Sequence, residues 1–355
     1  MNSRDKIIPN VIARPPFRGG RCNLVAFSNN EIAPEGSPGL PSSFEPTKNP
    51  AARPPRKDTF SYGGQAVIEG VMMRGRKTMA VSVRRPDGTI QTKTRPLSGI
   101  YQSRIAKIPV LRGVLLLWDT LGLGWESLSF SAEVQGEKPM GKGEWFGTIL
   151  LSVAILIGVF FLLPAAAAQW METALHVSAA AGNAVEGVIR LALLILYLVL
   201  VGRIPEIARV FAYHGAEHKT VGAFEAGAEL TPETVETFPK EHPRCGTSFL
   251  VVIALLSVLL FAAVGPLPFG WRIVSRVIGI PVLVAFGYEY LRFSARIRNP
   301  VLAKVLAAPG IWTQSLTTRE PDRSMLEVAI AAFQTVRRAD EPPQEQPAEA
   351  AAAGE

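Results

Sequence analysis

The stretch WFGTILLSVAILIGVFFLLPAAAA, residues 145–168, contains no ionisable side chain. A helix needs about 20 apolar residues to cross the hydrocarbon core of a bilayer, so this stretch predicts a membrane-spanning helix. Residues 245–271 predict a second one, because Cys245 is the one titratable side chain among them. The composition agrees with an integral membrane protein, since 48% of the 355 residues are hydrophobic and the mean hydropathy is positive.

Two further segments are apolar but interrupted. Residues 188–204 carry Arg190 near one end and Arg203 near the other, from where long side chains are able to reach the lipid headgroups. Residues 273–293 are interrupted by Arg276, Gly279, Pro281, Gly287 and Glu289. Polar groups in a spanning helix must be satisfied by protein, so this segment is expected to face the interior of a helix bundle. Together the segments predict about four transmembrane helices.

The distribution of Lys and Arg predicts the orientation, because short cytoplasmic connections are enriched in both. Residues 164–187, between the first two spans, contain neither, whereas residues 203–244 and 292–304 contain several. Both termini and the segment after the second span are therefore expected in the cytoplasm. Arg272 and Arg276, in the short third connection, do not fit this distribution.

The charge of the chain indicates which partners to expect. The formal net charge is +7, although residues 339–355 form an acidic tail without a basic side chain. Anionic lipids account for a basic membrane protein, so the lipid bilayer is the expected partner and nucleic acid is not. With two cysteines, Cys22 and Cys245, the chain has no disulfide framework, which is typical of a reducing compartment. The sequence predicts no particular oligomeric state.

Outside the membrane segments, turn signals and periodicity predict further elements. The turn signal at 86–88, followed by alternating β-branched residues, predicts a small sheet. Apolar residues at helical spacing between 108 and 130 predict an amphipathic helix on the bilayer or, equally, an ordinary packing helix. Asp322 is expected to cap a helix whose apolar face docks on the sheet.

These elements give the predicted fold class: a mainly α integral membrane protein with about four transmembrane helices, a small β-rich cytoplasmic subdomain and disordered termini. The expected regions are a disordered cytoplasmic tail (1–57), the β-rich subdomain (58–107), an amphipathic interfacial helix and linker (108–143), the four-span membrane domain (144–298), a cytoplasmic link and helix (299–338) and a disordered acidic tail (339–355).

The pentad His214-Gly-Ala-Glu217-His218 follows the second predicted span and uses two of the four histidines in the chain. Residues four apart lie on one face of a helix, so His214 and His218 are able to bind one metal ion. Glu217 lies beside them, where a carboxylate is able to act as general base toward a water molecule that the ion activates. The pentad therefore predicts a metal site, and the alternative is a pair of buried structural histidines.

A catalytic zinc site needs about three protein ligands and one open position, so a third ligand is expected from a neighbouring segment. The candidates are His242, Cys245, Glu289 and Glu225. His242 ranks first, because it is a neutral ligand close to the start of the third span, and Glu289 and Cys245 follow. Arg244 or Lys219 is the expected donor to a developing oxyanion. The expected cofactor is a divalent metal, with zinc favoured by the ligand types.

A second polar group lies in residues 62–75, which include the paired glycines Gly63 and Gly64. Glycine gives the backbone freedom to turn or to approach another group closely. Glu69 and Arg74 are expected either to pair or to contact a ligand, and a structural turn is the favoured interpretation. The segment does not match a phosphate-binding loop.

Several segments, in order, resemble one known family. They are GGQAVIEGVMMRG at 63–75, YHGAEHKT at 213–220, HPRCGTSF at 242–249, GYEYLR at 287–292, and LTTREP with LEVAIAAF between 316 and 333. They are similar to the YqhQ-like family, multi-pass bacterial membrane proteins of unknown function that are also described as predicted metal-dependent enzymes. The resemblance covers residues 60–336 and implies a protein of the bacterial cytoplasmic (inner) membrane. It supports grouping the pentad with His242, Cys245 and Glu289, and it names no substrate.

Three functions compete at this point. The leading hypothesis is a membrane-embedded zinc-type hydrolase that acts at the cytoplasmic interface on a membrane peptide or a lipid-linked substrate. The second is a noncatalytic membrane scaffold or assembly factor, in which a metal or a polar His and Glu cluster holds the spans together. A transporter ranks third, because no paired broken helix indicates an inverted repeat.

Overall fold

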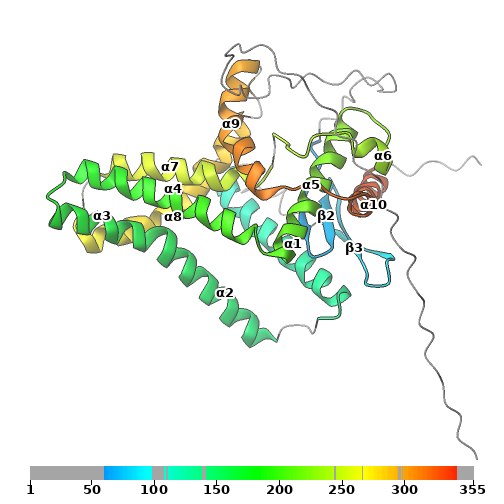
Figure 1. The fold of residues 1–355 in the computed structure, drawn as a ribbon, viewed down its shortest axis with the longest axis horizontal. Helices are drawn as coiled ribbons and strands as arrows, with labels where there is room; N and C mark the ends of the chain where they lie inside the picture. Colours follow the sequence, from blue (N-terminus) through cyan, green and yellow to red (C-terminus); the bar gives the residue numbers. More distant parts are fainter. Residues whose placement is uncertain are drawn as a thin grey trace, which may run out of the picture. The chain divides into compact units, whose positions relative to one another are not determined.

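The computed structural model describes residues 60–97, 108, 111–137, 141–243, 245–265, 267–294, 297 and 299–341. The disordered tail expected at 1–57 lies outside these residues, as does most of the acidic tail expected at 339–355. The described part is mainly helical and contains a small antiparallel sheet, as the predicted fold class requires (Figure 1).

The sheet has four antiparallel strands in the order β1-β2-β3-β4, so that β1 is an edge strand. The strands are β1 (Gly63–Val67), β2 (Gly70–Arg74), β3 (Thr78–Arg84) and β4 (Ile90–Pro96). Val67 pairs with Gly70, so β1 and β2 form a hairpin that turns at Ile68 and Glu69. Glu69 has the positive φ of 52° that is typical of such a two-residue turn. The predicted small sheet is thus confirmed.

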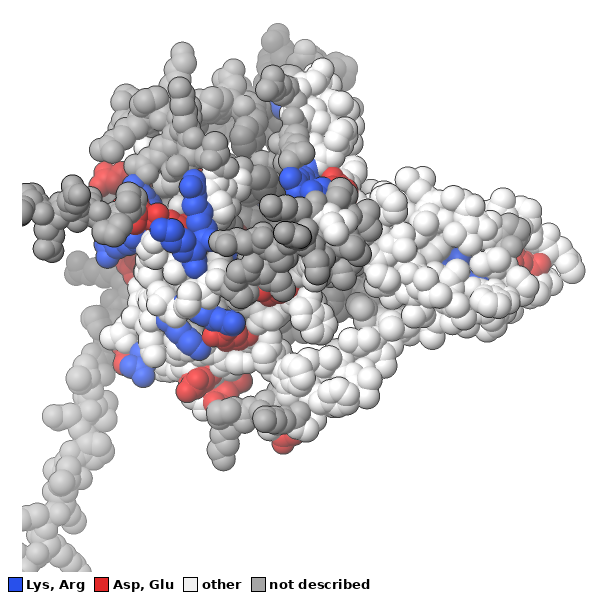
Figure 2. Space-filling model, turned by 180° about the vertical axis from the view of Figure 1, so that it is seen from behind, with Lys and Arg blue, Asp and Glu red and all other residues white. Residues whose placement is uncertain are grey.

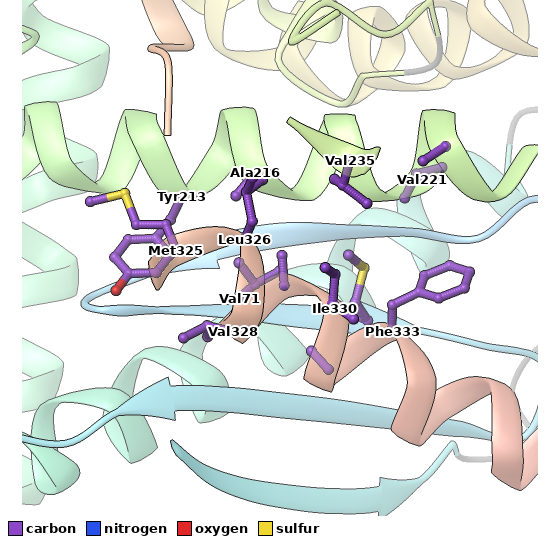
Figure 3. Close-up of a cluster of buried hydrophobic side chains, with 14 of the residues drawn as sticks. Val71, Tyr213, Ala216, Val221, Val235, Met325, Leu326, Val328, Ile330 and Phe333 are labelled. Carbon is purple, nitrogen blue, oxygen red and sulfur yellow. The ribbon is translucent and has the colours of Figure 1, made fainter. Parts of the chain in front are cut away.

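Helices cover both faces of the sheet. They are α1 (Leu111–Val134), α5 (Pro205–Glu225) and α10 (Arg323–Asp340). Figure 3 shows the core under α5 and α10, in which Val71 of β2, Ala216 of α5 and Phe333 of α10 lie together. Successive side chains of a strand point to opposite faces, so Met73 joins this core whereas Met72 joins the core under α1.

Helix α10 forms as the sequence predicts. The Asp322 carboxylate accepts a hydrogen bond from the N–H of Met325 at 3.0 Å and so caps the first turn. Leu326, Ala329 and Phe333, which repeat at helical spacing, are fully buried against the sheet and α5. The expected docking of this helix is confirmed.

Helix α1 has two different faces. Ser127 and Phe130 are buried against the sheet, which is the role of a packing helix. On the opposite face Trp118 is 76% exposed and Leu121 is 60% exposed. An exposed apolar face of this kind suits contact with a lipid surface. The interpretation of the 108–130 pattern as a packing helix is therefore confirmed for one face, and contact of the other face with the bilayer stays a prediction.

Three described helical segments are long and apolar enough to cross a membrane: Gly143–Ala174, Ala179–Val201 and Phe269–Ser294. The first joins α2 (Lys142–Ile157), the π-helical turn η3 (Gly158–Leu162) and α3 (Leu163–Ala174), and the others are α4 (Ala179–Val201) and α8 (Phe269–Ser294). The remaining predicted span corresponds to α7 (Ser248–Val264), a shorter apolar helix of 17 residues. It packs against both α4 and α8 (Figure 1).

Buried charged side chains connect these helices. Glu186 of α4 accepts hydrogen bonds of 2.6–2.8 Å from Arg190 of the same helix and from Arg276 of α8. Arg272 of α8 forms an ion pair with Glu172 of α3 at 2.8 Å. Arg190 therefore does not reach the headgroups as expected, because its partners lie inside the bundle. Arg272 and Arg276 are each neutralised by a carboxylate, which explains why they depart from the Lys and Arg distribution.

The link expected after the last span is helical in its described part. Helix α9 (Pro300–Thr317) begins after Asn299, whose side chain accepts the N–H groups of Val301 and Leu302 at 3.0 and 3.1 Å. Pro300 occupies the first turn, where a helix needs no N–H donor. The short helix α6 (Pro232–Val235) lies in the connection between α5 and α7.

Candidate metal centre

Helix α5 presents the pentad on its buried side. Three residues separate it from the end of α4, and Pro205 occupies its first turn. Glu217 and His218 are buried and His214 is half-buried. The ring centroids of His214 and His218 lie 4.4 Å apart, so the two imidazoles share one face of the helix as predicted.

The two imidazoles are oriented by backbone carbonyls. His214 Nδ1 lies 2.9 Å from the carbonyl oxygen of Thr317, and His218 Nδ1 lies 2.6 Å from that of Lys240. A carbonyl oxygen only accepts hydrogen bonds, so each Nδ1 carries the proton and each Nε2 keeps its lone pair. Burial lowers the pKa of His218, which further favours the neutral ring. Histidines that bind metals are held in this way.

Cys245 supplies the third donor. Its Sγ lies 3.3 Å from His214 Nε2, and one ligand atom each from His214, His218 and Cys245 lie within 4.8 Å of one another. Zinc bonds of about 2.1 Å to nitrogen and 2.3 Å to sulfur separate neighbouring tetrahedral ligands by roughly 3.4–3.6 Å. The three donors therefore lie close enough together to hold one metal ion after a small closure.

Glu217 lies next to this group. Its Oε2 is 3.5 Å from His218 Nε2, and the backbone N–H of Gly64 in β1 donates a hydrogen bond to its carboxylate. Burial raises the pKa of Glu217, an effect that the hydrogen bond from the Gly64 N–H opposes. A carboxylate whose pKa is raised by burial is a stronger base and is therefore better suited to accept a proton from water.

His242 lies beside the three donors but is not one of them. Its Nε2 is 3.3 Å from Glu225 Oε2, and its ring centroid is 5.8 Å from that of His218. The side chain of Gln314 holds its backbone at both ends, since Oε1 accepts from the His242 N–H at 2.7 Å and Nε2 donates to the His242 carbonyl at 2.9 Å. The geometry thus favours Cys245 over His242 as the third ligand, and Glu225 is the partner of the His242 side chain.

The other candidates have different surroundings. Glu289 of α8 pairs with Arg112 of α1, whose Nε lies 2.7 Å from Glu289 Oε1, and it is not part of the three-donor group. The ammonium of Lys219 pairs with Glu320 at 2.8 Å, so Lys219 is engaged away from the donors. Arg244 lies outside the described residues, and its expected role stays a prediction.

A cavity of about 500 Å³ adjoins the three donors and Glu217. Its lining residues come from α5 and the segment before α7, and also from residues 60–65, β2, α1 and α8. The lining residues are Phe60, Ser61, Tyr62, Gly63, Gly64, Gln65, Met72, Arg74, Thr120, Leu123, His214, Glu217, His218, Val221, His242, Cys245, Gly246 and Tyr288. The donors are therefore open to a space that a ligand of moderate size is able to fill.

The glycine-rich segment 63–75 forms a turn and also contributes to the lining of this cavity. A Cβ on Gly64 would lie 2.0 Å from the carbonyl oxygen of Met72, so only glycine fits there. Glu69 does not pair with Arg74 as one interpretation expected. It instead accepts hydrogen bonds from Arg209 at 2.5 Å and from Tyr213 at 3.2 Å, which tie the turn to α5.

Three residues of the site were not anticipated from the sequence. Thr317 and Lys240 orient the imidazoles through their carbonyl groups, and Gln314 holds the backbone of His242. Every residue has a main-chain carbonyl whatever its type, so nothing in the sequence indicated that Lys240 takes part in the site. Thr317 lies in the LTTREP segment, and its place in that family motif was the available indication.

Comparisons with known proteins agree with the resemblance. The model of a family described as "Protein of unknown function (DUF1385)" matches residues 108–339. The chain is also 32% identical over 295 residues to the "Uncharacterized protein YqhQ" of Bacillus subtilis (strain 168), which covers 78% of this chain and 92% of that protein. No solved structure matches. The expected family is therefore confirmed, and it carries no assigned activity.

Proposed function

Since the chain belongs to the DUF1385 family of unknown function, we propose its activity from the site itself: a metal-dependent membrane hydrolase of the zinc type. One observation carries the proposal. His214 and His218 both direct Nδ1 at a backbone carbonyl, and one ligand atom from each imidazole lies within 4.8 Å of the Cys245 Sγ. Two imidazoles that only form a core have no need to direct their lone pairs at one point.

Each residue has a role in this proposal. His214, His218 and Cys245 would hold the ion, which supplies Lewis acidity toward a carbonyl and toward water. Glu217 takes the proton from the attacking water and later delivers it to the leaving group. The Gly64 N–H holds the Glu217 carboxylate in place, and the cavity binds the substrate beside both.

The proposed location is the cytoplasmic side of the bacterial inner membrane. Figure 2 shows Lys and Arg side chains gathered at one end of the described part, whereas the apolar helices are nearly free of them. Because Lys and Arg favour the cytoplasmic side, we place the sheet, the site and both termini there. Substrates from the membrane, such as a peptide or a lipid-linked molecule, would suit this place.

The orientation is tested by labelling the His176→Cys variant from outside intact cells.

Metal analysis tests the core of the proposal. Protein purified in detergent without chelator is expected to contain about one zinc-type ion per chain, and His214→Ala should lose it. Glu217→Gln should retain the ion but lose turnover of ester and amide probes in proteoliposomes. Glu229→Gln, an exposed carboxylate shortly after α5, is the matched control and should keep both properties. A folded, metal-free wild-type protein would contradict the proposal.

A scaffold with a structural ion is the alternative, and one observation favours it. The donors join α5 to the segment before α7, and the carbonyl of Thr317 adds the end of α9. An ion here would therefore stabilise the packing of three elements. In that case Glu217→Gln would leave the cellular role intact, whereas loss of either histidine would lower the amount of folded protein.

A further inference from the structure

The cavity beside the donors is also lined by residues whose chemistry the metal centre does not use. We call them the second wall: Gln65, Met72, Arg74 and Thr120. Arg74 is the last residue of β2 and lies two residues after Met72, so both point to the face that α1 covers. Gln65 pairs with Met72 across β1 and β2 and therefore lies on the same face. All three residues line the cavity.

This second wall carries one guanidinium and several hydrogen-bond donors. Among the described residues that line the cavity, Arg74 is the one lysine or arginine and Glu217 is the one carboxylate. Glu217 belongs to the side of the metal donors, where the Gly64 N–H holds it. Within the described part of the chain, Gln65 Nε2 is buried without a hydrogen-bond partner. Thr120 adds a hydroxyl group to the same wall.

Arg74 keeps its charge in this position. Burial lowers its pKa and the nearby Asp119 of α1 opposes the effect, but a guanidinium stays protonated at neutral pH. Its planar group binds carboxylates and phosphates through two parallel hydrogen bonds. A half-buried guanidinium in a cavity wall therefore suits an anionic ligand.

The rest of the lining is mainly apolar and adjoins the membrane helices. Met72, Leu123 and Val221 contribute aliphatic surface, and Tyr288 comes from α8, one of the candidate spans. The volume of about 500 Å³ is within the range of small-molecule sites. An anionic ligand that fills this space must also carry an apolar portion.

We infer that the substrate is an anionic amphiphile whose carboxylate or phosphate binds Arg74 while its scissile carbonyl lies at the three metal donors. The inference rests on the proposed function and adds the substrate class to it. Gln65 donates to the same anion or to the polar group next to it. The apolar portion of the substrate contacts Leu123, Val221 and Tyr288.

Hydroxamate probes on the cobalt-loaded protein test the inference without a known substrate. Monohydroxamates of succinic, glutaric and adipic acid each carry a carboxylate at a different distance from the chelating group, and alkyl hydroxamates of equal length are the neutral controls. Binding is followed by the change in the visible cobalt spectrum in detergent. We expect one carboxylated probe to bind at least about tenfold more tightly than its neutral counterpart, as charge-assisted hydrogen bonds do.

Two variants connect this preference to Arg74. In Arg74→Gln the preference should disappear while the neutral probe binds as before, and Arg85→Gln, an exposed arginine of the same sheet unit, should keep it. Arg74→Lys retains the charge without the paired hydrogen bonds and should retain part of the preference. This variant provides the test if Arg74→Gln does not fold. A phosphono-hydroxamate that binds more tightly than the carboxylate of equal length indicates a phosphate-bearing substrate.

The outcomes separate the two proposals. A wild-type protein that binds cobalt and neutral hydroxamates, but shows no preference for any anionic probe, overturns the substrate class and leaves the metal enzyme standing. A preference that persists in Arg74→Gln also overturns it. A protein that gives no cobalt spectrum removes the proposed function and the inference with it.

Discussion

Alanine at Gly64 should damage both the sheet and the metal centre, whereas alanine at its neighbour Gly63 should not. A Cβ on Gly64 would lie 2.0 Å from the carbonyl oxygen of Met72, about 1 Å closer than such contacts occur. A Cβ on Gly63 meets no atom within 4 Å. The two positions are adjacent in one strand and belong to the same motif, so each is the natural control for the other.

The size of the effect follows from this distance. Because the obstacle is backbone, β1 must move away from β2 by about 1 Å, which strains the pairing around Gln65 and Met72. Overpacking of this kind costs about 1–3 kcal/mol, and one weakened backbone hydrogen bond adds about 1 kcal/mol. We expect Gly64→Ala to lower the free energy of unfolding by about 2–4 kcal/mol. Gly63→Ala should change it by less than about 1 kcal/mol, with a small gain from the reduced entropy of the unfolded chain.

Thermal unfolding in detergent and cobalt titration measure the two consequences. A loss of this size lowers Tm by roughly 3–6 °C in a protein of this length. The same displacement moves the Gly64 N–H away from Glu217, so binding of hydroxamates to the cobalt-loaded variant should weaken as well. Equal Tm values for the two alanine variants would refute the described contact between β1 and β2. Unchanged hydroxamate binding in a destabilised Gly64→Ala variant would refute the link to Glu217.

Three further predictions address the site, the turn and the core. Cys245→Ser should lower zinc content and remove the thiolate-to-metal charge-transfer band of the cobalt form, and a band that persists would exclude Cys245 as a ligand. The hydrogen bond from Arg209 is the largest cause of the lowered pKa of Glu69. The stabilisation that this pair gives to the folded protein is complete above the ordinary carboxyl pKa of 4.5, and it is lost as the pH falls through the lower pKa that Glu69 has in the folded protein. Glu69→Gln should therefore lower Tm at pH 7 and make no difference in stronger acid, and a constant difference would contradict this. Phe333→Ala should cost about 3–5 kcal/mol because the side chain is fully buried, whereas Phe146→Ala, at a site 62% exposed, should cost far less by the same melting assay.

Local patterns predicted the elements whose causes are local. Helix α10 followed from apolar residues at helical spacing and from the cap at Asp322, both of which lie within one segment. The hairpin of β3 and β4 followed from the turn signal at 86–88. The pairing of His214 with His218 followed from the helical repeat alone. In each case the residues that decide the structure are near neighbours in sequence.

Pairings between distant segments could not be predicted in this way. Cys245 and His242 lie three residues apart in a segment without regular structure, so no periodicity indicates which of them faces α5. Glu289 was a candidate ligand from a neighbouring segment, whereas its partner Arg112 lies 177 residues earlier in the chain. Arg190 has the position of a snorkelling residue, and only the three-dimensional neighbourhood of Glu186 explains its burial. Residue type and spacing do not encode such contacts.

The buried charges of the membrane helices and the metal donors are connected through two helices. Helix α4 carries Glu186 and Arg190 and leads, after three residues, into α5 with His214 and His218. Cys245 comes three residues before α7, and Arg190 Nη1 donates to Ser257 of α7 at 2.8 Å. Arg190 therefore fixes the position of α7 along α4 by a hydrogen bond between two buried side chains. A sliding of α7 along α4 would carry Cys245 away from both imidazoles, so the distance between thiol and imidazole reports the packing of the membrane helices.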